Sequence, residues 1–108
     1  MIKTISGIAA FAAAAIVSAG VSAGTLDDVK ARGELNCIVT TGLTGFAFTD
    51  ENGRWDGFDA SYCRGLAAAV LGSGEKVKFV PTTGKTRFTA LNSGEGDALF
   101  RNTTITMS

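Results

Sequence analysis

The chain has 108 residues, with 10 lysines and arginines balanced by 10 aspartates and glutamates, and no histidine. This length accommodates at most one small domain, and a neutral chain without a cluster of basic side chains is a poor candidate for binding nucleic acid. With two cysteines and no histidine, the composition does not favour a metal site, and no cofactor is expected.

The first 23 residues have the pattern of a cleaved signal peptide. Lys3 gives a basic start, an apolar, alanine-rich stretch follows at 5–17, and residues 21–23 (VSA) fit the small-x-small rule for signal peptidase. A transmembrane anchor is the alternative, but it needs about 20 strongly apolar residues, and this stretch is shorter. We therefore expect a periplasmic protein whose mature part is residues 24–108.

Cys37 and Cys63 are the two cysteines of the chain. In an oxidising compartment an isolated even pair usually forms a disulfide, and the spacing of this pair is too wide for a CxxC redox motif. Two buried free thiols are the alternative. We expect a structural disulfide, with no role in catalysis.

A short helix and a strand are predicted at the start of the mature chain. The helix spans residues 26–32. The Thr25 hydroxyl can accept a hydrogen bond from the amide of Asp28, as in a capping box, and Gly33 can take the left-handed conformation that ends a helix. The strand spans residues 35–40.

A hairpin and a longer helix follow. The hairpin is predicted over residues 46–55 and turns at Asn52-Gly53, a pair suited to positive φ. The longer helix covers residues 58–71, where apolar residues recur at helical spacing on one face, and glycines at 72 and 74 end it. The residues of that apolar face are Phe58, Tyr62, Leu66, Ala69 and Val70.

Two strands separated by a helix complete the pattern. The strands span residues 77–80, ending at Pro81, and 97–100, and the helix between them spans 85–93 and ends at Gly94. The order strand, helix, strand, helix, strand predicts parallel strands joined by right-handed crossovers, which is an α/β layer fold with a parallel β-α-β-α-β core.

Three polar segments follow the carboxyl ends of these strands, at residues 41–46, 82–84 and 101–104. Ligands of open parallel sheets bind beyond those ends. The segments are rich in glycine and threonine, so they offer backbone amides and hydroxyls. This composition predicts a site for a small polar ligand.

Catalysis is weakly indicated. A nucleophilic serine or cysteine lacks the usual histidine base, and residues 84–86 (GKT) resemble the end of a P-loop whose required earlier glycine is replaced by Phe79. For Asp59 and Asp97 we expect helix-capping and turn roles, with no perturbed pKa. We therefore expect no catalytic residue and no enzymatic activity.

The segments TLDDVKARGELNC, GRWDGFDASYCRGLAAAVLG, KVKFVP, RFTALNSGEGDALF and RNTTIT, in this order, resemble the extracellular solute-binding proteins of family 3, and most of all the general L-amino-acid-binding proteins. The resemblance implies a type II periplasmic binding protein fold, whose two lobes close on the ligand. It also implies the substrate-binding component of an ABC importer, with an L-amino acid as ligand and membrane permease subunits as partners. Residues 24–108 then form the N-terminal part of the first lobe, without the second lobe.

The resemblance further implies which residues hold the backbone groups of the amino acid. Thr104 matches the position whose amide and hydroxyl touch the ligand carboxylate. Asn102 and the backbone of Arg101 match positions that contact the α-amino group. The arginine that clamps the carboxylate in the family is expected directly after Ser108.

The expected side-chain pocket has two walls. Leu43 and Phe46 match apolar or aromatic positions on one side, and Thr83 and Gly84 match the loop that closes the other side. Leu43 replaces the aromatic residue of basic-amino-acid and glutamine binders, which favours a pocket of broad specificity.

Two other interpretations stay open. Periplasmic cyclohexadienyl dehydratases resemble the same fold and use a carboxylate in the cleft, so an enzyme is one alternative. A truncated fragment without function of its own is the other.

Overall fold

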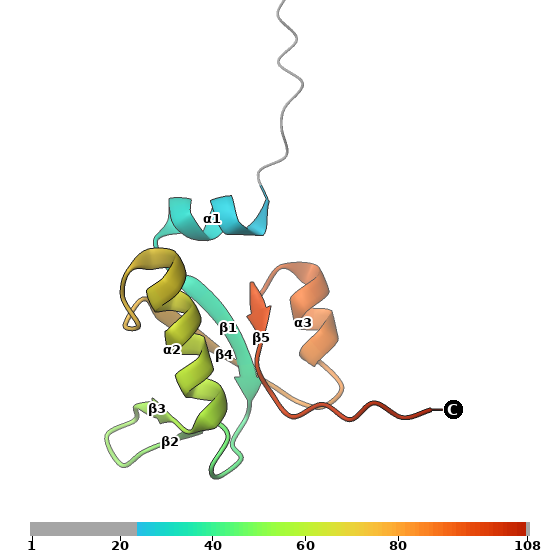
Figure 1. Ribbon diagram of the computed structural model, residues 1–108. Helices are drawn as coiled ribbons and strands as arrows, with labels where there is room; N and C mark the ends of the chain where they lie inside the picture. The colour runs from blue at the N-terminus through green and yellow to red at the C-terminus, as the bar shows by residue number, and fades with distance from the viewer. Residues whose placement is uncertain (1–23, 108) are drawn as a thin grey trace, which may run out of the picture.

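The computed structural model describes residues 24–107, so the expected signal peptide at 1–23 lies outside the described residues. No helix within 24–107 is both long and apolar enough to cross a bilayer. The elements, in chain order (Figure 1), are α1 (Thr25–Arg32), β1 (Leu35–Thr40), β2 (Phe48–Thr49), β3 (Trp55–Asp56), α2 (Phe58–Leu71), β4 (Val77–Thr82), α3 (Arg87–Ser93) and β5 (Ala98–Leu99).

Three parallel strands form the main sheet in the order β4-β1-β5. β1 pairs with β4 along its whole length, from Leu35 opposite Val77 to Thr40 opposite Thr82. The chain moves from β1 to β4 in one direction and from β4 across to β5 in the other. Right-handed crossovers therefore place α2 and α3 on opposite faces of the sheet. The predicted parallel β-α-β-α-β core is confirmed.

The core is centred on β1. Cys37 and Val39 face α2 and are fully buried together with Cys63 and Ala67 of that helix. Ile38 is fully buried as well, and since side chains alternate along a strand, it points to the opposite face. This burial on both faces is what the middle strand of a parallel sheet requires.

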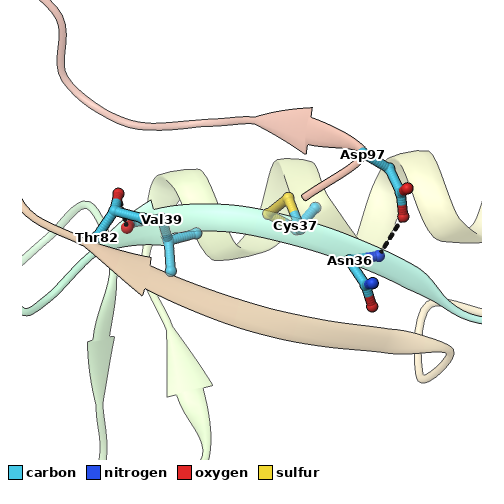
Figure 2. The surroundings of a disulfide bond; sticks show 6 residues. Asn36, Cys37, Val39, Thr82 and Asp97 are labelled. Atoms are coloured by element: carbon cyan, nitrogen blue, oxygen red, sulfur yellow. Dashed lines mark hydrogen bonds between the residues drawn. A yellow bond between two sulfur atoms is a disulfide. The ribbon is translucent and has the colours of Figure 1, made fainter. Parts of the chain in front are cut away.

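A disulfide joins β1 to α2. Cys37 and Cys63 are bonded with their Cα atoms 5.9 Å apart, within the usual range for a disulfide. Figure 2 shows Cys37 at the middle of β1, with its sulfur bonded toward the helix behind the strand. The predicted pairing is confirmed.

The buried face of α2 differs from the predicted one. Ala60, Cys63 and Ala67 are fully buried, whereas Phe58 and Tyr62 are 59% and 52% exposed. Small side chains let the helix lie close to the sheet, as the disulfide requires. Leu66 and Val70 of the predicted face pack partly buried against the core, whereas Phe58 and Tyr62 lie on the flank of the helix.

That flank carries a row of aromatic rings. The ring centroids of Phe58 and Tyr62 are 4.8 Å apart, and those of Tyr62 and Phe100 are 5.7 Å apart. The rings border an open hollow that is also lined by Ser61, Gly65 and Leu66.

The predicted capping box of α1 is wrong. The helix begins at Thr25 itself, its N-cap is Gly24, and no side chain caps it. The Asp28 amide donates to the Gly24 carbonyl at 3.1 Å, so the Thr25 hydroxyl is not its acceptor. The predicted exit is confirmed, because Gly33 has φ 73°.

The hairpin turns in a different way from the prediction. Gly53 has positive φ but Asn52 does not. The Asp50 carboxylate instead accepts hydrogen bonds from the amides of Asn52 and Arg54, each at 2.9 Å. An aspartate that binds backbone amides ahead of it stabilises such a turn without a second left-handed residue.

The end of β4 differs from the prediction, whereas the hydrogen bonds of β5 agree with it. Pro81 lies inside β4, opposite Val39, and does not end the strand at Val80. Among the described strands β4 is paired on one side only, where a missing N–H is tolerated. The ladder of β5 covers the predicted strand, because the Asp97 amide donates to Asn36 O and the Phe100 amide donates to Ile38 O.

Asp97 ties three elements together and does not serve the predicted turn. Its carboxylate accepts the Asn36 amide at 2.7 Å, which Figure 2 marks with a dashed line, and forms an ion pair with Arg32. The contact joins the start of β5 to β1 and to α1.

Breaking the disulfide should lower the free energy of unfolding by about 3.5 kcal/mol, because the cross-link closes a long loop in the unfolded chain. We expect this loss in urea unfolding of Cys37→Ala/Cys63→Ala, followed by Trp55 fluorescence. Wild type in reductant should lose a similar amount. Two titratable thiols in the unreduced, denatured wild type would contradict the pairing.

Candidate functional site

The carboxyl ends of β1, β4 and β5 lie at one edge of the sheet, because the strands are parallel. The three polar segments predicted from the sequence therefore meet at this edge, which we call the carboxyl edge. In Figure 1 the loop after β1, the loop before α3 and the C-terminal segment all leave the sheet there.

The loop after β1 is fastened to the first turn of α2. The Gly45 carbonyl accepts from the Phe58 amide at 2.9 Å, and the Phe46 carbonyl accepts from the Asp59 amide at 2.7 Å. These bonds satisfy donors that a helix leaves unpaired at its start, and α2 has no side-chain cap. The loop is thereby fixed. Because its carbonyls accept hydrogen bonds from the first amides of α2, those amides are not free to bind an anion.

Gly57 makes this approach possible. Its φ is 107°, and a Cβ atom at this position would lie 2.5 Å from the Phe46 carbonyl oxygen. The glycine before the helix was not among the residues singled out from the sequence. The signal for it was available in the run Gly57-Phe58-Asp59, where only glycine permits such contact.

Leu43 and Phe46 lie in a tight turn of this loop. The Leu43 amide donates to Ala47 O at 2.8 Å, and the Leu43 carbonyl accepts from the Phe46 amide at 3.0 Å. The side chains of Leu43 and Phe46 are 38% and 43% exposed. Their backbones are held while their apolar side chains remain accessible, as a pocket wall requires.

Thr83 and Gly84 lie in the loop between β4 and α3. The Thr83 amide donates to the Thr86 hydroxyl at 3.0 Å, and the Thr86 amide donates to the Thr83 hydroxyl at 3.2 Å. This reciprocal pair holds the loop and delays the start of α3 to Arg87, two residues after the predicted start. Gly84 is exposed, with nothing within 4 Å of a Cβ built on it.

Two arginines hold the segment after β5 to the two ends of the loop between β4 and α3. Arg101 Nη1 donates to the Thr82 carbonyl at 2.6 Å, and Arg87 Nη1 donates to the Asn102 carbonyl at 2.9 Å. Thr104 is exposed. The structure thus brings Arg101 and Asn102 to the loop that carries Thr83 and Gly84.

Asp59 does not have the predicted capping role. The side chain makes no cap hydrogen bond, the residue is only 7% exposed, and its Oδ2 atom has no hydrogen-bond partner. Burial raises the pKa of this carboxyl group above its usual value, and the positive charge of Arg101 opposes that rise. The expectation of an unperturbed pKa was wrong, because the sequence does not reveal that the loop after β1 covers this residue.

The open hollow on the flank of α2 adjoins the carboxyl edge at Phe58 and Phe100. It contains none of the residues predicted to bind ligand. The predicted residues border an open edge, with Leu43 and Phe46 fixed to α2 and with Arg101 and Asn102 fixed to the loop after β4. Among residues 24–107, no group of three or more cysteine, aspartate or glutamate side chains is arranged to hold a metal ion.

Known proteins match this chain over most of its length. Residues 35–108 match the family described as bacterial extracellular solute-binding proteins, family 3. The glutamate/glutamine/aspartate/asparagine-binding protein BztA of Rhodobacter capsulatus is 61% identical over 90% of this chain and 29% of its own length. The general L-amino acid-binding periplasmic protein AapJ of Rhizobium johnstonii is 51% identical over 98% of this chain and 31% of its own length. The chain therefore spans less than a third of these curated relatives.

Solved structures match the fold as well. An ABC-transporter periplasmic binding protein from Brucella ovis with glutathione bound has a TM-score of 0.74 and 58% identity, covering 78% of this chain and 26% of that chain. An ancestral cyclohexadienyl dehydratase has a TM-score of 0.68 and 34% identity, covering 80% of this chain and 34% of that chain.

Replacing Gly57 by alanine should destabilise the carboxyl edge. The φ of Gly57 alone costs an alanine roughly 1–3 kcal/mol, and the contact with the Phe46 carbonyl adds to that cost. Gly84→Ala is the matched control and should change stability by less than about 0.5 kcal/mol, because its Cβ meets open space. Urea unfolding of the two variants measures the difference. Equal midpoints would contradict the fixed loop.

Proposed function

We propose, from the premise that this chain belongs to the bacterial extracellular solute-binding proteins of family 3, that it is the N-terminal part of the first lobe of a periplasmic protein that binds L-amino acids for an ABC importer. The type II periplasmic binding protein fold is confirmed, in the form of a partial lobe. The observation that carries the functional proposal is the gathering of three polar segments at the carboxyl edge, two of them joined by Arg101 and Arg87 and the third bonded to the start of α2.

In this proposal the segment after β5 binds the groups that all amino acids share. Thr104 offers its amide and hydroxyl to the carboxylate, and Asn102 and the backbone of Arg101 contact the α-amino group. The anchoring of Asn102 O by Arg87 and of the Arg101 side chain to Thr82 supports this role, because it fixes the segment before a ligand arrives. Groups that are already positioned bind a ligand at a smaller entropic cost.

The loop residues form the side-chain pocket. Leu43 and Phe46 provide an apolar wall, and Thr83 and Gly84 close the opposite side. Because this wall is uncharged and Gly84 leaves open space, the pocket accepts side chains of several kinds. The names of the two curated relatives, one covering four amino acids and the other L-amino acids in general, support a broad range.

The cellular setting of the proposal follows from the family, whose members are extracytoplasmic. Residues 1–23 serve as the cleaved signal peptide, the mature chain acts in the periplasm, and permease subunits in the membrane receive the loaded protein. The Cys37–Cys63 disulfide supports an oxidising compartment.

Binding without catalysis is the function that the carboxyl edge supports best. The curated relatives are named as binding proteins. Asp59 is a buried carboxyl group at this edge, but the charge that acts on it is that of Arg101, and no nucleophile among residues 24–107 is hydrogen-bonded to it. We therefore infer no dehydratase activity, although an ancestral dehydratase shares the fold.

The complete protein that carries this chain should bind several L-amino acids, with affinities within about a hundredfold of one another. The uncharged wall of Leu43, Phe46 and Gly84 provides no strong basis for selecting one charged side chain. Isothermal titration with a panel of L-amino acids measures the range. A preference above about a hundredfold for one charged amino acid, about 2.7 kcal/mol, would contradict the broad pocket.

Residues 24–108 alone should not bind amino acids at micromolar concentration. A zwitterion is strongly solvated, and the site must replace that solvation at both ends. In this chain Thr104 and nearby amides face the carboxylate without the family's clamping arginine, and a charge-assisted hydrogen bond is worth roughly 1.5–3 kcal/mol. NMR titration with glutamate, glutamine and leucine is the test. Saturable shifts at Thr104 and Phe46 with micromolar ligand would show that this half-site suffices.

A further inference from the structure

Three charged side chains gather at the carboxyl edge. Asp59 lies in the first turn of α2, Arg87 is the first residue of α3, and Arg101 follows β5. Each of the three has a buried polar atom without a hydrogen-bond partner, namely Asp59 Oδ2, Arg87 Nε and Arg101 Nε. The cluster therefore combines a net positive charge with unused hydrogen-bonding capacity.

The guanidinium of Arg101 is held across the end of β1. β1 lies between β4 and β5, so a side chain that starts after β5 and reaches the Thr82 carbonyl at the end of β4 spans the end of the middle strand. A guanidinium carries several N–H donors in a rigid plane. Within the described residues, the bond to Thr82 is the one hydrogen bond that this group makes.

Asp59 balances the charge of Arg101 without pairing with it. Burial and the nearby Arg87 lower the pKa of Arg101, while the charge of Asp59 acts in the opposite direction. The two groups interact electrostatically, yet no ion pair within 4.0 Å joins them in the described part of the chain. Arg101 is thus a positioned, half-buried cation, and its Nη2 group makes no hydrogen bond among residues 24–107.

We propose that the guanidinium of Arg101 ranks the amino acids bound at this edge, by donating hydrogen bonds to a carboxylate or amide oxygen at the end of the ligand side chain, with Asp59 as its buried counter-charge. This inference rests on the proposed function, since it needs an amino acid bound at the carboxyl edge. It assigns the side chain of Arg101 a role separate from that of its backbone. Because an arginine fork matches two oxygens in one plane, carboxylate ligands gain most.

The ranking stays within a broad pocket. A charge-assisted hydrogen bond at a partly exposed group changes affinity by roughly tenfold, which leaves apolar amino acids as weaker ligands. Lysine should be the weakest ligand of comparable length, because its ammonium group meets a fixed positive charge.

The test compares Arg101→Gln with wild type in the complete protein, by isothermal titration with glutamate, glutamine, leucine and lysine at pH 8. We expect glutamate to bind roughly tenfold more weakly to the variant, leucine to change less than about twofold, and lysine to bind more tightly. The gain for lysine is the decisive sign, since a variant that merely folds poorly binds every ligand more weakly.

Three further variants sharpen the comparison. Asp59→Asn removes the counter-charge and should shift the ranking the other way, with tighter glutamate and weaker lysine. Arg54→Gln is the matched control: Arg54 is an exposed arginine on the hairpin that is paired with Glu75, and its loss should leave all four affinities unchanged. Arg101→Lys keeps the charge without the fork, so it should retain most discrimination against lysine while losing part of the affinity for glutamate.

The outcomes separate this inference from the proposed function. If wild type binds none of the amino acids, the proposed function fails and this inference fails with it. If wild type binds them and Arg101→Gln weakens glutamate, leucine and lysine by the same factor, Arg101 serves the shared carboxylate or the fold, and the ranking role is wrong. Unchanged affinities in the variant would also overturn it.

Discussion

The burial of β1 is the constraint on which the other elements depend. This strand has paired strands on both sides and helices on both faces, so five of its six residues are buried. Cys37 ties it covalently to α2, the Asn36 amide donates to the Asp97 carboxylate, and the Val39 carbonyl accepts from the Thr82 hydroxyl. Each neighbouring element is thus positioned by its contact with β1.

The segments at the carboxyl edge are positioned by the elements packed around β1. Helix α2 begins there because the disulfide fixes its middle against β1, and its unpaired amides then need acceptors. The loop after β1 supplies them through the carbonyls of Gly45 and Phe46. One requirement, the satisfaction of helix amides, therefore also positions the apolar residues that border the proposed pocket. Arginine contacts to Thr82 O and Asn102 O join the other two segments to each other.

Periodicity predicts the element order well, because strands and helices of this fold are local patterns. It fails where tertiary contact decides. The larger apolar residues of α2 predicted a buried face through Phe58 and Tyr62, but the disulfide selects the face with small side chains. The burial of Asp59 could not be predicted either, since it results from a loop that closes over the helix start. Gly33 and Gly94 end their helices as expected, because the left-handed conformation that ends a helix depends on a single residue.

The disulfide is local in the chain, and this has a consequence for the order of events during biogenesis. Its 26-residue separation encloses the loop after β1 and the β2–β3 hairpin, and it involves neither β4 nor β5. In a chain that emerges from its N-terminus, both sulfurs are present before the outer strands exist. Oxidation can therefore precede sheet assembly, and the β1–α2 unit becomes a preformed template on which later strands add. Contacts of low sequence separation close at a smaller entropic cost, which favours this order.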